Sequence, residues 1–98
     1  MIRAKFTQNR LTVEGHAGYA PKGQDIVCAA VSALVYALIG TLEETENAAE
    51  VILRPGYAAV EAREKTAAFD LVRCGLGQLA ERYGDFIRVE WVSHKNIM

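Results

Sequence analysis

Residues 15–34 read GHAGYAPKGQDIVCAAVSAL, and the rest of the chain is organised around this stretch. It begins with a glycine and a histidine, crosses a glycine-containing segment, and enters a long apolar run just after Asp25. Aspartate is a favourable helix N-cap, because its carboxylate accepts hydrogen bonds from backbone N–H groups two and three residues later. Gly and Pro argue against regular structure over 17–24. The stretch therefore predicts a loop followed by a helix from Ile26 to about Glu46.

Outside this stretch, apolar and polar residues alternate with a period of two, which predicts strands. The predicted strands are residues 2–7, 11–16, 50–54, 57–64 and 86–92. Pro55-Gly56 suits a type II turn, and Thr66 is a suitable cap for a second helix that ends near Tyr83. The order strand, strand, helix, strand, strand, helix, strand predicts an α+β two-layer sandwich, with two helices on a mostly antiparallel sheet. We expect a single domain over residues 1–98.

The first predicted helix is apolar around most of its circumference, and such a helix is usually buried on all sides. One sheet face and one further helix leave part of it uncovered in a chain of 98 residues, so we expect a homodimer. In the second helix, Gly75 and Gly77 indicate close packing against the first. In the last strand, Ile87, Val89 and Trp91 share one face.

The composition is 51% hydrophobic and 23% charged with a net charge of −1, which indicates a globular core and argues against direct nucleic-acid binding. The first ten residues, MIRAKFTQNR, lack the apolar core of a signal peptide. The apolar run 26–42 only just reaches the roughly 17 residues of a membrane span, so we expect a core helix and no membrane contact. Two cysteines make no disulfide framework in such a chain, and we expect a reduced, cytoplasmic protein.

His16, at the end of the second predicted strand, and Cys28, in the first turn of the first predicted helix, form the candidate catalytic pair. A thiol attacks a carbonyl as its thiolate, and both a helix N-terminus and a neighbouring imidazolium favour this form. The N–H groups of that first turn are also suitable donors for the oxyanion of a tetrahedral intermediate. His16 would accept the thiol proton and later give it to the leaving amine.

The residues around this pair each have two interpretations. Asp25 either caps the helix only, or also orients the His16 ring as the third member of a triad does. Ser32, one turn after Cys28, and Tyr19, in the loop, are candidates for a substrate pocket. The Ser32 hydroxyl can instead bond its own helix.

Each member of the pair also has a purely structural interpretation, because many strand-end histidines are ordinary surface residues and many cysteines are small buried hydrophobes. Cys74 is expected as a core or half-exposed residue, and His94 is a rival base. Two distant cysteines and two scattered histidines do not make a metal site. Gly18 and Gly23 fit no phosphate-binding spacing, so we expect neither metal nor cofactor.

The motif Gly15-His16-Ala17, followed by a short loop and then DIVCAAVS over 25–32, resembles the ribosomal-processing cysteine protease family, Prp. The resemblance implies that His16 and Cys28 are the catalytic dyad, that the chain forms a homodimer, and that a flexible loop carrying His16 closes over the substrate. It also implies the substrate, which is the N-terminal extension of large-subunit ribosomal protein twenty-seven. That extension would be cut after aromatic residues and before a small one.

Two other functions compete with this hypothesis. A non-catalytic, ribosome-associated binding module would use the basic residues Arg3, Lys5 and Arg10 of the first hairpin against RNA. A thiol redox or peroxide sensor would use Cys28, although no resolving cysteine lies near it in the sequence.

Overall fold

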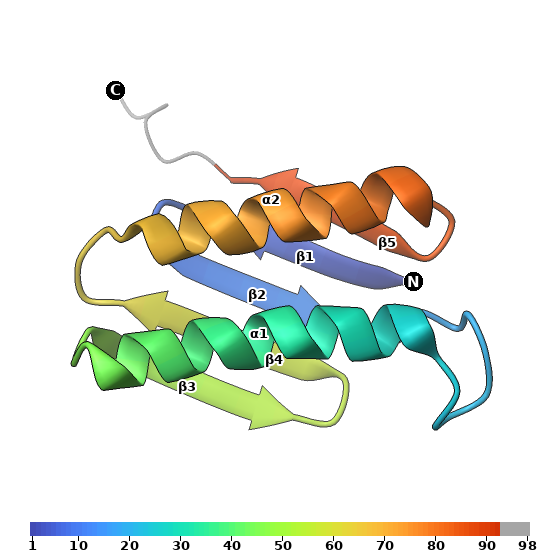
Figure 1. Cartoon of the computed structure of the whole chain (residues 1–98), viewed down its shortest axis with the longest axis horizontal. Helices are drawn as coiled ribbons and strands as arrows, with labels where there is room; N and C mark the ends of the chain where they lie inside the picture. The colour runs from blue at the N-terminus through green and yellow to red at the C-terminus, as the bar shows by residue number, and fades with distance from the viewer. Residues whose placement is uncertain (93–98) are drawn as a thin grey trace.

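The computed structural model describes residues 1–92 as a five-stranded sheet with two helices on one of its faces (Figure 1). The elements are β1 (Ile2–Phe6), β2 (Arg10–Glu14), α1 (Ile26–Glu44), β3 (Ala48–Arg54), β4 (Tyr57–Ala62), α2 (Ala67–Arg82) and β5 (Ile87–Trp91). This order and layering confirm the predicted α+β two-layer sandwich. Helix α1 ends at Glu44 rather than near Glu46, because Thr45 is its C-cap and Glu46 has a left-handed φ of 56°.

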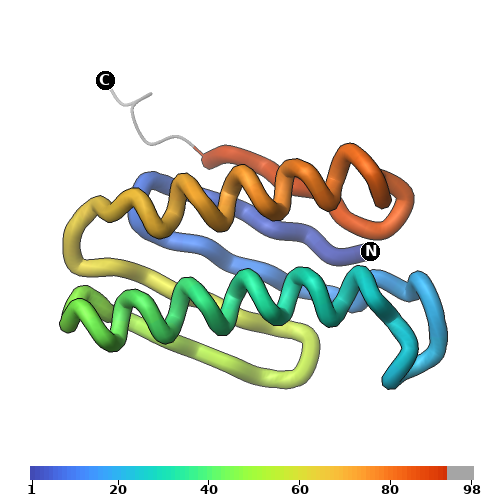
Figure 2. Tube along the Cα trace, viewed as in Figure 1, coloured from blue at the N-terminus to red at the C-terminus, as the bar shows by residue number. Residues whose placement is uncertain are grey.

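The strands lie side by side in the order β3-β4-β2-β1-β5. Three neighbouring pairs are antiparallel, and β1 pairs with β5 in parallel. A parallel pair needs a long crossover connection, because the second strand must start at the same end of the sheet as the first. Helix α2, which directly precedes β5, carries the chain back to that end. The first and last strands of the described chain are therefore neighbours, as the tube trace shows (Figure 2).

The core lies between the sheet and the two helices. The alternating apolar residues of the strands face it, as predicted for Ile2, Ala4, Phe6, Leu11 and Val13. Helix α1 contributes Val27, Val31, Val35, Leu38, Ile39 and Leu42, and α2 contributes Phe69, Val72 and Leu76. Burial of these apolar side chains is the main stabilising term for the two layers.

Helix α1 is buried on one side only. Ile26 is 54% exposed and Tyr36 is 62% exposed. By length and composition alone, the helix is also long and apolar enough to cross a membrane. The sheet and α2 therefore leave one apolar side of α1 uncovered in the single chain, as the sequence predicted.

One expectation about packing is corrected in part. Gly75 does pack against α1, since a Cβ built on it would lie 3.1 Å from Leu34 Cδ1, but a Cβ on Gly77 would meet nothing within 4 Å. Trp91 lies under the guanidinium of Arg73, 5.4 Å from it, and remains 54% exposed. The reason is that β5 is an edge strand of the sheet, so its last side chain has no neighbouring strand on one side.

We expect Leu42→Ala to lower the free energy of unfolding by about 2–5 kcal/mol, because Leu42 is fully buried between α1 and the sheet. Leu71→Ala is the matched control: Leu71 is 72% exposed on α2, and its truncation should change stability by less than about 0.5 kcal/mol. Urea denaturation followed by circular dichroism measures both. Equal effects of the two substitutions would contradict the packing of α1 described above.

Candidate active site

The carboxylate of Asp25 joins the loop to the start of α1. Its Oδ1 accepts the N–H groups of Val27 at 3.0 Å and Cys28 at 2.9 Å, and its Oδ2 accepts the N–H of Tyr19 at 3.0 Å. The pKa of Asp25 is lowered below its ordinary value. The hydrogen bond from the N–H of Cys28 is the largest cause, and those from Tyr19 and Ala20 add to it, while desolvation opposes them. The predicted capping role is confirmed, and both oxygens are occupied by backbone donors.

Cys28 lies in the first turn of α1 with its side chain half-buried. Its Sγ accepts a hydrogen bond from the backbone N–H of Ala17 at 3.4 Å. Ala17 directly follows His16, so this contact ties the sulfur to the segment that carries the imidazole.

One expectation about the oxyanion is corrected. The sequence suggested that free N–H groups in the first turn of α1 would face a tetrahedral intermediate. The N–H groups of Val27 and Cys28 instead donate to Asp25 Oδ1, because the N-cap satisfies them. The donor that the structure places beside the sulfur is the N–H of Ala17, from the loop.

The backbone around His16 is held on both sides. The N–H of Gly15 donates to the carbonyl of Gly56 at 2.9 Å, and the amino group of Met1 donates to the carbonyl of His16 at 2.6 Å. The His16 side chain is exposed, and its ring lies against Gly56. Within residues 1–92, no hydrogen bond joins His16 to Cys28 or to Asp25.

His16 and Cys28 line the same cavity, whose volume is about 290 Å³. Ser32 and Tyr36 line it from α1, and the segment Arg54–Tyr57 between β3 and β4 forms another wall. The structure thus brings together three of the predicted site residues, His16, Cys28 and Ser32. The β3–β4 turn was missed as part of the site, because Pro55-Gly56 predicts a turn but not what the turn faces.

Tyr19, the other candidate for the pocket, lies outside the residues that line this cavity. Its ring packs edge-on against Tyr83 and Phe86, with ring centroids 5.7 and 5.2 Å apart. Such edge-to-face aromatic pairs are favourable, so the apolar body of Tyr19 anchors the middle of the loop at the end of α2. The pocket role predicted for Tyr19 does not agree with this position.

The other candidates for chemistry lie apart from the pair or outside the described chain. Cys74 is exposed on α2, so it is not the core or half-exposed residue that was expected. His94 lies outside the described residues. Within residues 1–92 no group of three or more His, Cys, Asp or Glu residues is arranged to hold a metal ion.

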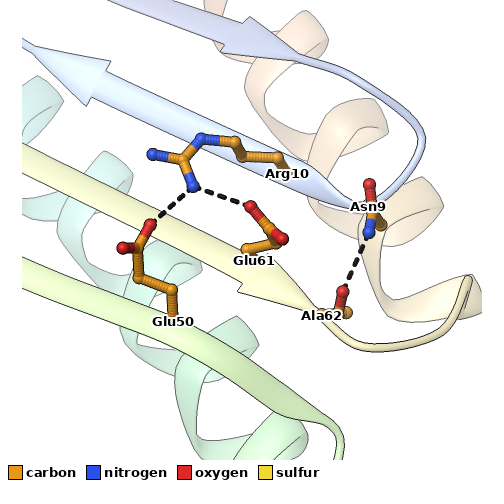
Figure 3. Close-up of polar contacts among 5 residues, drawn as sticks. All are labelled: Asn9, Arg10, Glu50, Glu61 and Ala62. Carbon is orange, nitrogen blue, oxygen red and sulfur yellow. Dashed lines mark hydrogen bonds and ion pairs between the residues drawn. The ribbon is translucent and has the colours of Figure 1, made fainter.

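The first hairpin carries less free positive charge than its sequence indicates. Arg10 Nη1 donates to Glu50 at 2.6 Å and to Glu61 at 2.8 Å (Figure 3). The hydrogen bonds to Glu50 and then to Glu61 raise the pKa of Arg10 above its ordinary value. Because two carboxylates already neutralise this guanidinium, the hairpin is a weak candidate for an RNA-binding surface.

Comparison with known proteins connects this arrangement to a family. The sequence model of the family described as cysteine protease Prp matches residues 1–88. The chain belongs to the Prp family. The ribosomal processing cysteine protease Prp of Mycoplasma pneumoniae is 34% identical over 94 residues, covering 92% of this chain and 94% of the relative. The Prp of Mycoplasma genitalium is 30% identical over 101 residues, which cover 97% of this chain and 100% of that relative. The chain is therefore a cysteine protease of the ribosomal-processing family.

Solved structures of similar proteins have the same fold. The S. aureus ribosomal processing protease Prp, in complex with a covalently linked product peptide, has a TM-score of 0.84 at 20% identity and covers 94% of this chain and 100% of that one. The Streptococcus mutans protein SMU.848 has a TM-score of 0.76 at 27% identity and covers 96% of each chain. The α+β sandwich described above is thus the fold of Prp structures.

The lowered pKa of Asp25 predicts a pH-dependent contribution to stability. The unfolded chain binds the Asp25 proton more tightly than the folded chain does. The stabilisation of the folded chain by ionised Asp25 is therefore complete above the ordinary pKa of 3.8, and it is lost as the pH falls through the lowered pKa of the folded state. We expect Asp25→Asn to reduce the thermal unfolding midpoint at pH 7 and 5, and the difference from wild type to narrow at pH 3.

Thermal unfolding followed by circular dichroism measures this difference. Asp70→Asn is the control, since Asp70 is an exposed aspartate whose carboxylate pairs with Arg73 on the surface of α2. A difference between wild type and Asp25→Asn that stays constant from pH 7 to 3 would show that the charge of Asp25 does not hold the loop and the helix together.

Proposed function

We propose that this protein is an endopeptidase that removes the N-terminal extension of large-subunit ribosomal protein twenty-seven, with Cys28 as nucleophile and His16 as general base and acid. The observation that carries the proposal is the cavity that His16 and Cys28 line together at the amino end of α1. A peptide substrate agrees with the S. aureus Prp structures, one with a product peptide and one with a substrate peptide. We place the activity in the cytoplasm, where a catalytic thiol stays reduced.

In the first step, the Cys28 thiol gives its proton to His16, and the sulfur attacks the carbonyl carbon of the scissile peptide bond. The tetrahedral intermediate collapses as the C–N bond breaks, and His16 gives the proton to the leaving amine. A thioester of the substrate on Cys28 remains. Water then attacks this thioester with His16 as base, the C–S bond breaks, and the acid product and the thiol are released.

One contact in the structure supports this sequence of steps. The N–H of Ala17 already donates to Sγ at 3.4 Å, so it lies within reach of an oxygen that develops charge on the carbon bonded to that sulfur. His16 must come within about 3 Å of the thiol before proton transfer. Because Gly56 holds the N–H of the preceding Gly15 and Met1 holds the carbonyl of His16, rotation of the His16 side chain would supply this approach.

We expect Cys28→Ala to lower kcat/KM for a tagged N-terminal extension by about 10⁴-fold or more, since the nucleophile is removed. We expect His16→Ala to lower it by about 10²–10⁴-fold, since general acid–base catalysis is lost. Cleavage is measured by mass spectrometry of the products. Cys74→Ala is the matched control, because Cys74 is an exposed cysteine on α2, and it should cleave at the wild-type rate. Wild-type cleavage by Cys28→Ala would rule out Cys28 as the nucleophile.

The proposal includes a homodimer formed through the uncovered side of α1. This side is apolar and exposed, and it contains Ile26, Ala29, Ala33, Tyr36 and Ala37. Exposed apolar surface of this kind commonly marks a protein–protein interface. Tyr36 also lines the cavity, so the interface would lie next to the site.

We expect wild-type protein to sediment at micromolar concentration with twice the mass of one chain, and Ala33→Glu to sediment as a monomer. A charge on this side of α1 would lose water at the interface without gaining a partner. Ala67→Glu, on the exposed first turn of α2, is the matched control and should remain dimeric. A wild-type monomer under these conditions would contradict the dimer.

A further inference from the structure

The turn between β3 and β4 approaches the His16 ring very closely. Gly56 has a φ of +73°, which fits the third position of a type II turn that begins at Arg54. A Cβ built on Gly56 would lie 2.9 Å from His16 Nε2, 3.5 Å from Cε1 and 3.7 Å from Cδ2. The first of these distances is shorter than a van der Waals contact, so only glycine leaves room for the ring where it lies.

The same turn also holds the backbone that carries the ring. The carbonyl of Gly56 accepts the N–H of Gly15 at 2.9 Å, directly beyond the paired residues Glu14 and Tyr57. The register of β2 and β4 therefore places the turn beside His16, and the hydrogen bond fixes the distance between them. These contacts restrain the backbone next to His16, so the side-chain torsions are its softest degrees of freedom.

We propose that Gly56 is a positioning residue for the general base: its missing side chain leaves room for the His16 ring beside the β3–β4 turn, and rotation of the side chain brings the ring from there to Cys28. This inference rests on the proposed catalytic role of His16. Two separate features favour glycine here, the positive φ and the close approach of the His16 ring. Asparagine tolerates the positive φ, so substitutions can separate the two.

The contact itself is tested by NMR on wild-type protein with labelled histidine. The expected result is a nuclear Overhauser effect between the His16 ring protons and the Gly56 Hα protons. His94 is the only other histidine in the chain, so His94→Gln assigns the two ring signals. Absence of this effect in the folded wild-type protein would overturn the proposal without any assay of activity.

The consequence is tested with Gly56→Ala and Gly56→Asn. Both place a Cβ against the ring, so both should shift the His16 ring signals and lower kcat by about 10–100-fold with KM changed by less than about threefold. Gly23→Ala controls for backbone strain, since Gly23 has a φ of +90° and no atom within 4 Å of its added Cβ. It should lower the unfolding midpoint as Gly56→Ala does, yet leave the His16 ring signals in place.

Equal losses of kcat in Gly56→Ala and Gly56→Asn, despite a smaller loss of stability in the asparagine variant, would support positioning by the absent Cβ. A kcat within twofold of wild type in either folded variant would overturn it. If wild-type protein cleaves no ribosomal-protein extension, the proposed function fails. The Overhauser effect and the ring shifts would still decide whether Gly56 positions His16.

Discussion

The hydrogen bonds of the Asp25 carboxylate are the constraint on which the geometry of the site depends. One oxygen caps α1 through Val27 and Cys28, and the other accepts the N–H of Tyr19 from the loop. A single side chain therefore sets both the start of the helix and the path of the segment that precedes it. The N–H of Ala17 can reach Cys28 Sγ because the loop is drawn back toward the helix in this way.

The sheet supplies the second half of the site through strand register. Glu14 on β2 pairs with Tyr57 on β4, so the residues that follow Glu14 meet the turn that precedes Tyr57. This pairing brings Gly15 within hydrogen-bond distance of Gly56 and places the His16 ring against the turn. A shift of one residue in this register would move His16 away from the turn and reverse the buried side of β2. The burial of Leu11 and Val13 therefore also maintains the position of the imidazole.

Much of the fold follows from local patterns in the sequence. Alternation of apolar residues predicts the strands, and the two N-caps, Asp25 and Thr66, predict where the helices begin. These features depend on residues within about four positions of one another, so the linear sequence contains the necessary information. The same holds for Cys28, because its position three residues after the N-cap Asp25 places it in the first turn of α1. The uncovered side of α1 also follows from its composition and from the small size of the chain.

The sequence by itself determined the elements, their order, the two caps and the candidate pair. Only the tertiary structure decided that β1 pairs with β5 in parallel, that Gly56 faces His16, and that Tyr19 packs on Tyr83 and Phe86 instead of lining the cavity. It also decided that the cap occupies the N–H groups expected for an oxyanion, leaving Ala17 beside the sulfur. The physical reason is that these contacts join segments far apart or compete for the same donors. Their outcome depends on strand register and on burial of the whole core, which no local pattern contains.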